Sequence, residues 1–231
     1  MGVFDRVVGR GNGSEPPPVS WDDTAVRNEG TAREPIEYEG TTYRCITERS
    51  PDGGWTAAFG LAADRSEQRL FLVRDGRLRT TTRLDHPKSG AVANDGTTVI
   101  AGAGDSDDIG GRVAAFDATG NRLVERDCGS NVSSVAVTPD GRYGAGVTLK
   151  PDCETVILDL GRGTVAAVHE NREGNKYLTR FDRSDDGWRL YLSDEGAAKP
   201  LYAVDTDGEV AWKSDRYREP PSLLDWLRPG S

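Results

Sequence analysis

The stretch "VTPDGRYGAG" at residues 137–146 carries the pattern that decides the fold. It joins two apolar runs through a Pro-Asp-Gly turn, in which glycine accepts the positive φ that a tight turn needs. The same type of turn recurs along the chain, and its glycines are Gly53, Gly96, Gly141 and Gly187. Successive glycines are 43, 45 and 46 residues apart. The chain therefore contains a repeat of about 45 residues.

A second series of turns is interleaved with the first. Its glycines are Gly76, Gly120, Gly163 and Gly208, and their spacings are 44, 43 and 45 residues. The two series divide each repeat into four short strands, which in the third repeat are 132–138, 143–149, 155–161 and 164–170. Four consecutive strands per repeat are typical of a β-propeller blade. The sequence predicts an all-β fold, a small β-propeller of about four four-stranded blades.

The ends of the repeat array allow two arrangements. A ring of four blades is at the small end of the ~4–8 range. In one arrangement the segment "PIEYEGTTY" at 35–43 adds a strand to the last blade and closes the ring. In the other, the array stays open and dimerisation completes a larger ring. Both place the propeller domain at residues 35–216.

Two blades resemble known propeller repeats. The segment "LYAVDTDGEVAWKS" at 201–214 resembles a PQQ-type repeat, and "VAVTPDGRYGAGV" at 135–147 resembles a WD40-like blade. The resemblance implies a propeller fold, which hosts many functions. No blade carries the Gly-His and Trp-Asp pair of true WD40 repeats, and the adjacent cysteine pair of quinoprotein alcohol dehydrogenases is missing. PQQ chemistry is therefore not carried over to this chain.

The composition of the chain is acidic and poor in lysine. The 231 residues have a formal net charge of -9, and five of the 29 basic residues are lysine. Abundant carboxylates with scarce lysine indicate a halophilic protein, whose hydrated surface stays soluble at high salt. The arginines are scattered rather than grouped in a basic block, which argues against a nucleic-acid partner.

The cysteines and the hydropathy pattern bear on location. Cys45, Cys128 and Cys153 are far apart and odd in number, which fits a reducing compartment better than a disulfide framework or a zinc site. The chain contains no apolar stretch near the ~20 residues of a membrane-spanning helix. It also lacks the continuous apolar region of a signal peptide. We expect a cytoplasmic protein.

The N-terminal region is expected to lie outside the propeller. Residues 1–10 place four apolar side chains on one side of a short amphipathic helix: Val3, Phe4, Val7 and Val8. Residues 11–34 form a flexible linker rich in Gly, Ser and Pro. The helix either binds a partner or the inner membrane surface, as a peripheral contact, or is a disordered start without a role. Two helical turns bury little apolar surface, so anchoring would need several copies of the chain.

The C-terminal tail, residues 217–231, contains a second short apolar segment. Its apolar residues are Leu223, Leu224, Trp226 and Leu227. This segment either docks on the propeller or projects as a partner-binding peptide. The other notable tryptophans, Trp55 and Trp188, directly follow equivalent turns, so we expect both to pack in the core or between blades.

One loop suggests a metal. In "GDSDDIGG" at 104–111, the residues Asp105, Asp107 and Asp108 offer the hard oxygen ligands that calcium prefers. The alternative is a solvated acidic loop, because the spacing lacks the distal glutamate of an EF-hand.

Of the two histidines, His86 lies in a loop between the first two repeats and His169 ends a strand. The chain contains no nucleophile or metalloprotease motif, so we predict no catalytic residue and no cofactor other than this calcium.

These observations predict a non-catalytic binding or scaffold propeller that mediates protein–protein interaction, with a protein partner or a homo-oligomer. Its candidate binding loops are 84–90, 103–112, 148–155 and 193–200. One alternative is an enzyme with a carboxylate and arginine site in the propeller channel. A second alternative is a sensor of calcium or of another small ligand.

Overall fold

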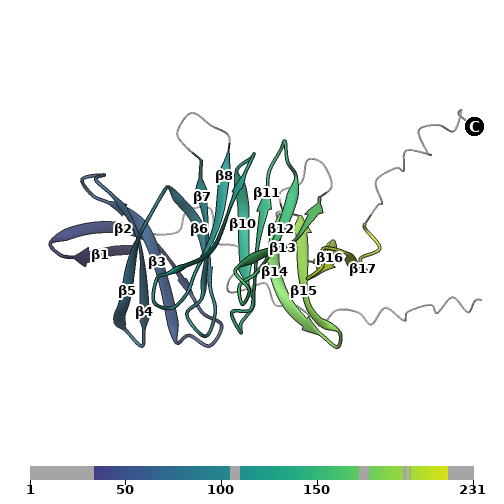
Figure 1. The fold of residues 1–231 in the computed structure, drawn as a ribbon, viewed down its shortest axis with the longest axis horizontal. Coiled ribbons are helices and arrows are strands. Elements are labelled where there is room, and N and C mark those ends of the chain that lie inside the picture. The colour runs from purple at the N-terminus through teal and green to yellow at the C-terminus, as the bar shows by residue number, and fades with distance from the viewer. Residues whose placement is uncertain (1–33, 105–109, 172–176, 195–196, 198, 218–231) are drawn as a thin grey trace, which may run out of the picture.

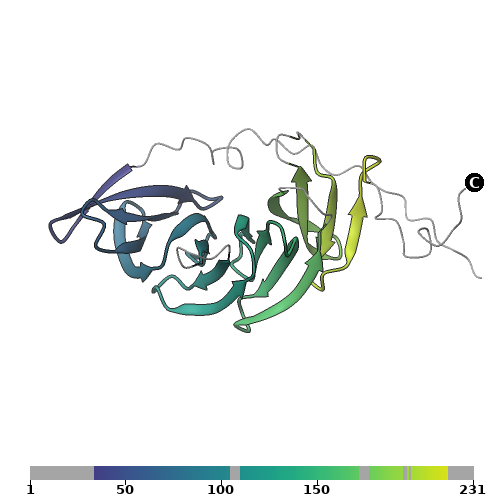
Figure 2. The ribbon, with the colours of Figure 1, turned by 90° about the horizontal axis from the view of Figure 1, so that it is seen from above.

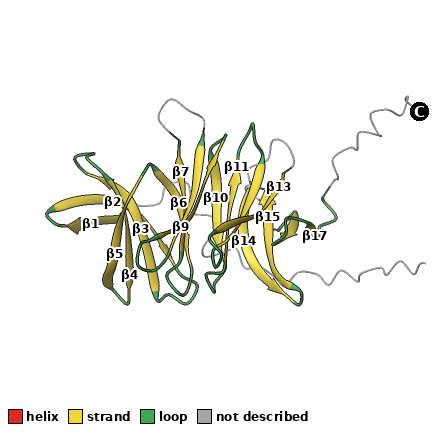
Figure 3. Ribbon diagram, viewed as in Figure 1, coloured by secondary structure: helices red, strands yellow, loops and turns green. Residues whose placement is uncertain are grey.

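The computed structural model describes residues 34–104, 110–171, 177–194, 197 and 199–217. These residues form seventeen strands in four antiparallel sheets, which follow one another along the chain (Figure 1). All the regular elements are strands, as Figure 3 shows by colour. Among the described residues, no helix is long and apolar enough to cross a membrane.

The order of strands within each sheet is the order along the chain. The first sheet contains β1 (Glu34–Tyr38), β2 (Thr41–Arg49), β3 (Trp55–Ala62), β4 (Gln68–Arg74) and β5 (Arg77–Leu84). The second contains β6 (Pro87–Val92), β7 (Thr98–Ala103), β8 (Gly111–Phe116) and β9 (Arg122–Cys128). The third contains β10 (Val132–Val137), β11 (Tyr143–Thr148), β12 (Glu154–Asp159) and β13 (Thr164–Glu170). The fourth contains β14 (Tyr177–Ser184), β15 (Gly187–Asp194), β16 (Tyr202–Asp205) and β17 (Val210–Lys213).

The predicted repeat is confirmed. The four strands of the third sheet agree with the predicted segments 132–138, 143–149, 155–161 and 164–170 to within two residues at each end. Burial alternates along the inner strand β10, whereas the central strands β11 and β12 are buried at almost every position. Central strands are buried on both faces because sheets pack against both sides of the blade, which favours the continuous apolar runs seen in the sequence.

The sheets stack face to face along an arc, and Figure 2 shows the first and fourth sheets at its two ends. Packing joins consecutive sheets: β3 lies against β6, β10 against β6 and β7, and β10 against β14. Each junction has its own apolar cluster, centred on Phe59 and Ile100, on Val113 and Val156, and on Ile157 and Tyr202. The strong packing contacts among the described residues therefore run from each sheet to the next one along the chain.

Every outer strand carries a β-bulge at the same position. The pairing of β5, β9, β13 and β17 with the neighbouring strand skips one residue, respectively Arg79, Leu123, Ala166 and Ala211. A bulge twists and interrupts the free edge of a sheet, which protects that edge from pairing with another strand. The four blades thus share an edge feature that follows the repeat spacing.

The outer turn of a sheet joins its last two strands. In the second, third and fourth sheets, this turn packs against the last strand of the preceding sheet. A Cβ added to Gly120 would lie 2.4 Å from Thr82 Oγ1, and one added to Gly208 would lie 2.9 Å from the Cβ of Ala167. Thr82 also donates a hydrogen bond of 2.9 Å to the carbonyl of Gly120. Glycine at these turns therefore allows neighbouring blades to approach closely, because a side chain would collide with the preceding blade.

One expectation about the first strand is wrong. The segment 35–43 does not add a strand to the last blade, because β1 and β2 pair with each other as a hairpin that begins the first sheet. The hairpin turn is Glu39-Gly40, and both residues have positive φ, as a two-residue hairpin turn requires. A neighbouring strand is the easier partner because a short loop costs little entropy to close. Completion of the ring by a second chain remains a prediction.

The β1–β2 hairpin covers the outward face of the first sheet. The ring of Tyr38 lies edge-on to that of Phe71, with centroids 5.5 Å apart, and Ile36 packs beside it. Beneath them, Cys45 and Phe71 are buried although no other sheet lies on this side. The Glu67 carboxylate adds an ion-pair network: it accepts hydrogen bonds from Tyr43 and Arg69 and pairs with Arg83 at 3.0 Å. The first sheet is thus capped by its own extra strand.

Candidate functional site

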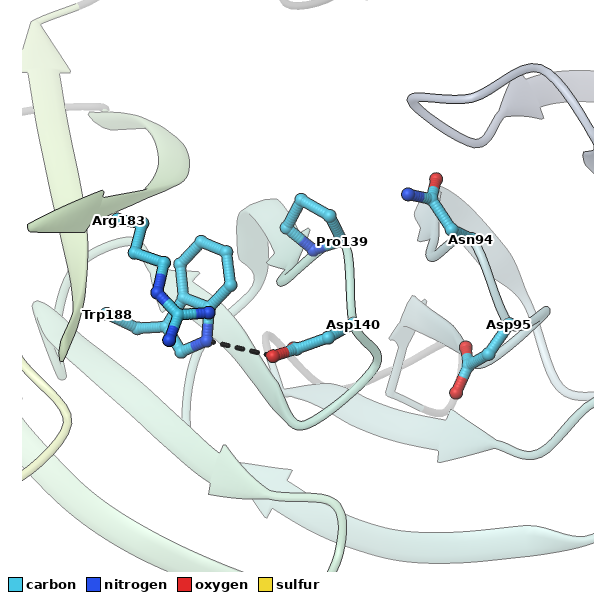
Figure 4. Close-up of a pocket in the computed structure, with 6 residues that line it drawn as sticks. All are labelled: Asn94, Asp95, Pro139, Asp140, Arg183 and Trp188. Atoms are coloured by element: carbon cyan, nitrogen blue, oxygen red, sulfur yellow. Dashed lines mark hydrogen bonds between the residues drawn. The ribbon is translucent and has the colours of Figure 1, made fainter.

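We call the turns β2–β3, β6–β7, β10–β11 and β14–β15 the inner turns. A hollow of about 470 Å³ opens at the end of the sheets where these turns lie (Figure 4). Its lining residues come from the inner turns of the second and third sheets and from the first two strands of the fourth. These residues are Asn94, Asp95, Pro139, Asp140, Arg183 and Trp188. The hollow therefore depends on the packing of three successive blades.

The two carboxylates of the hollow are oriented by their own turns. Asp95 Oδ1 accepts a hydrogen bond of 2.9 Å from the amide of Thr97, and Asp140 Oδ1 accepts one of 3.1 Å from the amide of Arg142. Such bonds from a side chain to the backbone two residues on are typical of aspartate in turns. The second oxygen of Asp95 accepts a hydrogen bond of 3.0 Å from the hydroxyl of Thr97, whereas that of Asp140 accepts one from outside its own turn.

Hydrogen bonds also join the successive turns. The amide of Asn94 donates to the carbonyl of Pro139 at 3.0 Å, and the side-chain oxygen of Asn94 accepts from the amide of Asp52 at 3.1 Å. Trp188 Nε1 donates to Asp140 Oδ2 at 3.1 Å, as the dashed line in Figure 4 shows. The inner turns of the four sheets are therefore connected in sequence, which fixes the shape of the hollow.

The wall formed by the fourth sheet combines an aromatic ring with a cation. Arg183 and Trp188 are paired across β14 and β15, and the guanidinium carbon lies 5.5 Å from the centre of the indole ring. This distance is within the range of a cation–π contact. With Asp95 and Asp140 opposite, the hollow carries two carboxylates against one guanidinium.

The protonation state of Asp140 follows from its contacts. Burial raises the pKa of Asp140, but hydrogen bonds from Thr138, from the amide of Arg142 and from Trp188 outweigh it, and the pKa lies below its usual value. Asp140 is therefore ionised at neutral pH. A carboxylate held in this state favours a cationic ligand over a role as a proton donor.

The two histidines lie away from the hollow. His86 Nδ1 is 3.2 Å from the side-chain nitrogen of Gln68, in the loop between β5 and β6, as predicted. His169 is next to last in β13, and its Nδ1 lies 2.9 Å from the carbonyl of Gly208. Over the described ranges, no hydrogen bond joins a histidine to a carboxylate, and no three His, Cys, Asp or Glu side chains gather as a metal would require.

Trp55 and Trp188 lie in the core and between blades, as predicted. Trp55 is buried in the cluster between the first two sheets, and Trp188 packs between the third and fourth. Cys45, Cys128 and Cys153 are free cysteines, and Cys45 and Cys128 are buried.

Several predicted site residues lie outside the described residues. They are Asp105, Asp107 and Asp108 of the calcium candidate, Val3, Phe4, Val7 and Val8 of the N-terminal segment, and Leu223, Leu224, Trp226 and Leu227 of the tail. The calcium site and both terminal binding segments therefore stay predictions.

The sequence pointed to a different end of the blades. Loops 84–90 and 148–155, and the described ends of loops 103–112 and 193–200, lie opposite the inner turns, because strands alternate in direction. Sequence reasoning used the inner turns only to measure the repeat and missed Asp140 and Trp188 as members of one site. The signal in the sequence that points to this site is Trp188, which directly follows an acidic inner turn. It lies 48 residues after Asp140 of the preceding inner turn.

Comparison with known proteins supports the fold. No family model and no curated protein matches the sequence. Among solved structures, Chaetomium thermophilum Sqt1 bound to the N-terminus of the ribosomal protein L10 matches with a TM-score of 0.52 and 16% identity, over 75% of this chain and 50% of that chain. Kuenenia stuttgartiensis hydrazine synthase matches with a TM-score of 0.48 and 14% identity, over 73% and 60% of the two chains. The Myceliophteria thermophila Cps50 (Swd1) β-propeller domain matches with a TM-score of 0.43 and 13% identity, over 67% and 49%.

The sheets define the class of protein, and the match to Sqt1 supports the fold. The chain is an all-β propeller protein whose four blades are four- or five-stranded antiparallel sheets. It spans about half the length of the Sqt1 chain that it matches. The halophilic character and the PQQ-like repeat remain predictions.

Proposed function

We propose that this protein is a non-catalytic propeller that binds a partner protein in the cytoplasm, and that its hollow holds a basic side chain from an extended segment of that partner. One observation carries the proposal: the hollow places the carboxylates of Asp95 and Asp140 opposite the indole of Trp188 on hydrogen-bonded turns of three blades. A site on rigid turns loses little conformational entropy when it binds.

The chemistry of the lining supports a cationic ligand. The two carboxylates exceed the single guanidinium of Arg183, and Asp140 stays ionised at neutral pH. Trp188 adds an aromatic surface of the kind enriched at the energetically important positions of protein interfaces. The net charge of -9 favours the approach of a basic segment over longer distances, and more strongly at low salt.

The comparison with Sqt1 supports a terminal peptide as the ligand. That protein was solved bound to the N-terminus of the ribosomal protein L10. At 16% identity the match concerns the fold, so the transfer of a peptide-binding role to this chain belongs to the proposal.

The test is selection from a random peptide library on the immobilised full chain, repeated with Asp95→Asn/Asp140→Asn. Asparagine removes the charge and keeps one oxygen for the backbone hydrogen bond of each turn. Its NH2 group replaces the oxygen that accepts from Thr97 in Asp95 and from Trp188 in Asp140. We expect Lys- or Arg-containing peptides to be enriched, and the double variant to bind them at least tenfold more weakly.

Asp117→Asn is the matched control. Asp117 also accepts hydrogen bonds from its own turn, through Thr119 and Asn121, but it lies in an outer turn away from the hollow. This variant should bind like the parent. Enrichment of peptides without basic residues, or equal loss of binding in Asp117→Asn, would overturn the proposed site.

A further inference from the structure

The fourth sheet has an outward face on which no described sheet packs. Side chains of its strands alternate, and Leu190, Leu192 and Val204 point to the third sheet, where they are buried. The outward positions therefore hold the intervening residues, which are Leu178, Arg180, Tyr191, Ser193, Ala203 and Trp212. Both ends of a stacked array need a cover for such a face.

The centre of this face is aromatic. Ala203 pairs with Tyr191 on one side and with Trp212 on the other, and the two rings approach across it with centroids 5.9 Å apart. Tyr191 retains 9% of its exposure and Ala203 none. Together these side chains offer an apolar surface, which we call the aromatic face.

A buried hydroxyl on the same face lacks a partner. Ser193 is fully buried, and its hydroxyl has no hydrogen bond to any described residue. A buried hydroxyl without a partner costs about 1–3 kcal/mol, so natural structures almost always provide one. Its burial beside Tyr191 points to a chain segment outside the described ranges that covers the face.

The first sheet shows how this fold covers an end. There the β1–β2 hairpin lays Tyr38 and Ile36 over Phe71, so an extra segment from the same chain takes the place of a neighbouring blade. At the other end, the described strands stop with β17, and the chain has no counterpart of that hairpin within the described residues.

We infer that residues 218–231 cover the aromatic face and cap the last blade. The described chain ends at Tyr217, five residues after Trp212. Its ring lies 5.2 Å from that of Tyr202, on the side that faces the third sheet, so the following residues would reach the aromatic face around the end of the fourth sheet. The following segment carries four apolar residues in five positions, Leu223, Leu224, Trp226 and Leu227. Burying them on this face removes both apolar surfaces from water.

The length of the segment is sufficient. Fourteen extended residues span up to about 46–50 Å, whereas four strands spaced about 4.8 Å apart are less than 20 Å wide. The other terminal segment, residues 1–33, precedes Glu34 of the first sheet, and Figure 2 shows this sheet at the opposite end of the arc. Docking of the nearer segment closes a shorter loop and costs less entropy. The inference concerns a different surface from the hollow and does not rest on the proposed function.

The test is hydrogen–deuterium exchange of the full chain with Leu223→Ser/Trp226→Ser. We expect amides of β15, β16 and β17 to exchange at least tenfold faster, while those of the second sheet stay unchanged. The matched control is Phe4→Ser/Val7→Ser, which alters the other terminal apolar segment and should leave exchange in the fourth sheet as in the parent.

A reciprocal measurement makes the result independent of local stability. Hydroxyl-radical labelling of Trp226 should be low in the parent and should rise in Tyr191→Ser, which removes an aromatic ring from the proposed docking surface and leaves the tail unchanged. Unchanged exchange in Leu223→Ser/Trp226→Ser, a response confined to Phe4→Ser/Val7→Ser, or protection that grows with protein concentration alongside a dimeric mass in light scattering would each overturn the inference.

Discussion

Trp188 of the fourth blade donates a hydrogen bond through Nε1 to Asp140 of the third, at 3.1 Å. The bond both orients a carboxylate of the hollow and joins two blades. Trp188→Phe keeps most of the ring and removes the donor. Asp140→Asn keeps the oxygen that accepts from the amide of Arg142 but replaces the oxygen that accepts from Trp188 with an NH2 group. Urea unfolding of both single variants and the double variant should give a coupling of about 1 kcal/mol, within the usual range for one hydrogen bond. Trp212→Phe, at an outward position, should show no coupling with Asp140→Asn.

Close packing around Gly96 predicts that Gly96→Ala lowers the stability of the protein more than Gly53→Ala, at the equivalent position of the preceding repeat. Gly53 and Gly96 both have positive φ, so alanine is strained at either, by about 1–2 kcal/mol. A Cβ at Gly96 would also lie 2.8 Å from the ring of Trp55, whereas at Gly53 no atom lies within 4 Å. Gly96→Ala should therefore lose about 1–3 kcal/mol more than Gly53→Ala in urea unfolding. Equal losses would show that the contact with Trp55 adds nothing.

The buried carboxyl of Glu48 predicts that a neutral substitute is more stable than the parent at high pH. It lies on β2 opposite Ala57, and burial raises the pKa of its carboxyl from 4.5 to about 7. Because the folded pKa is the higher one, ionisation destabilises the fold progressively from about pH 4.5 to pH 7, and the penalty stays constant above that. Glu48→Gln should match the parent near pH 4 and be about 1–2 kcal/mol more stable at pH 8. The exposed change Glu209→Gln controls for loss of one charge and should show no such rise.

Glu67 predicts the opposite pH dependence, because its ionised carboxylate stabilises the fold. Hydrogen bonds from Arg69 and Tyr43, together with the charge of Arg83, lower the pKa of its carboxyl to about 2. Its stabilising contribution is therefore complete above the usual pKa of 4.5 and disappears as the pH falls through 2. Thermal unfolding should show Glu67→Gln less stable than the parent at pH 7 and indistinguishable from it near pH 2. A difference that persists unchanged at pH 2 would contradict this assignment.

The repeat, the strands and the blade count follow from local signals. Two turn series with one spacing define four strands per unit, and the glycines at those turns have the positive φ that the turns require. The β1–β2 hairpin was equally local: Glu39-Gly40 separates two strands by two residues. The expectation for 35–43 nevertheless assigned it to a distant sheet, because its use in closing the ring outweighed the hairpin signal.

The hollow could not be predicted in the same way. Asp95, Asp140 and Trp188 are separated by 45 and 48 residues, and only the stacking of blades brings them together. The bulges at Arg79, Leu123, Ala166 and Ala211 are also invisible in the pattern, because the outer strands are half exposed and their alternation is weak. Such features depend on contacts between elements rather than on the residues within one element.

The packing of each outer turn on the preceding blade gives the array a direction. Gly120 and Gly208 lie against the strands of the sheets before them, whereas Gly76, in the first sheet, meets no atom within 4 Å of an added Cβ. A duplicated blade placed after the fourth sheet would find a bulged outer strand ready to receive its turn. One placed before the first sheet would meet the Tyr38 hairpin instead. A blade added at the C-terminal end would therefore displace only the tail that we propose as a cap, whereas one added at the N-terminal end would displace a hairpin of the first sheet.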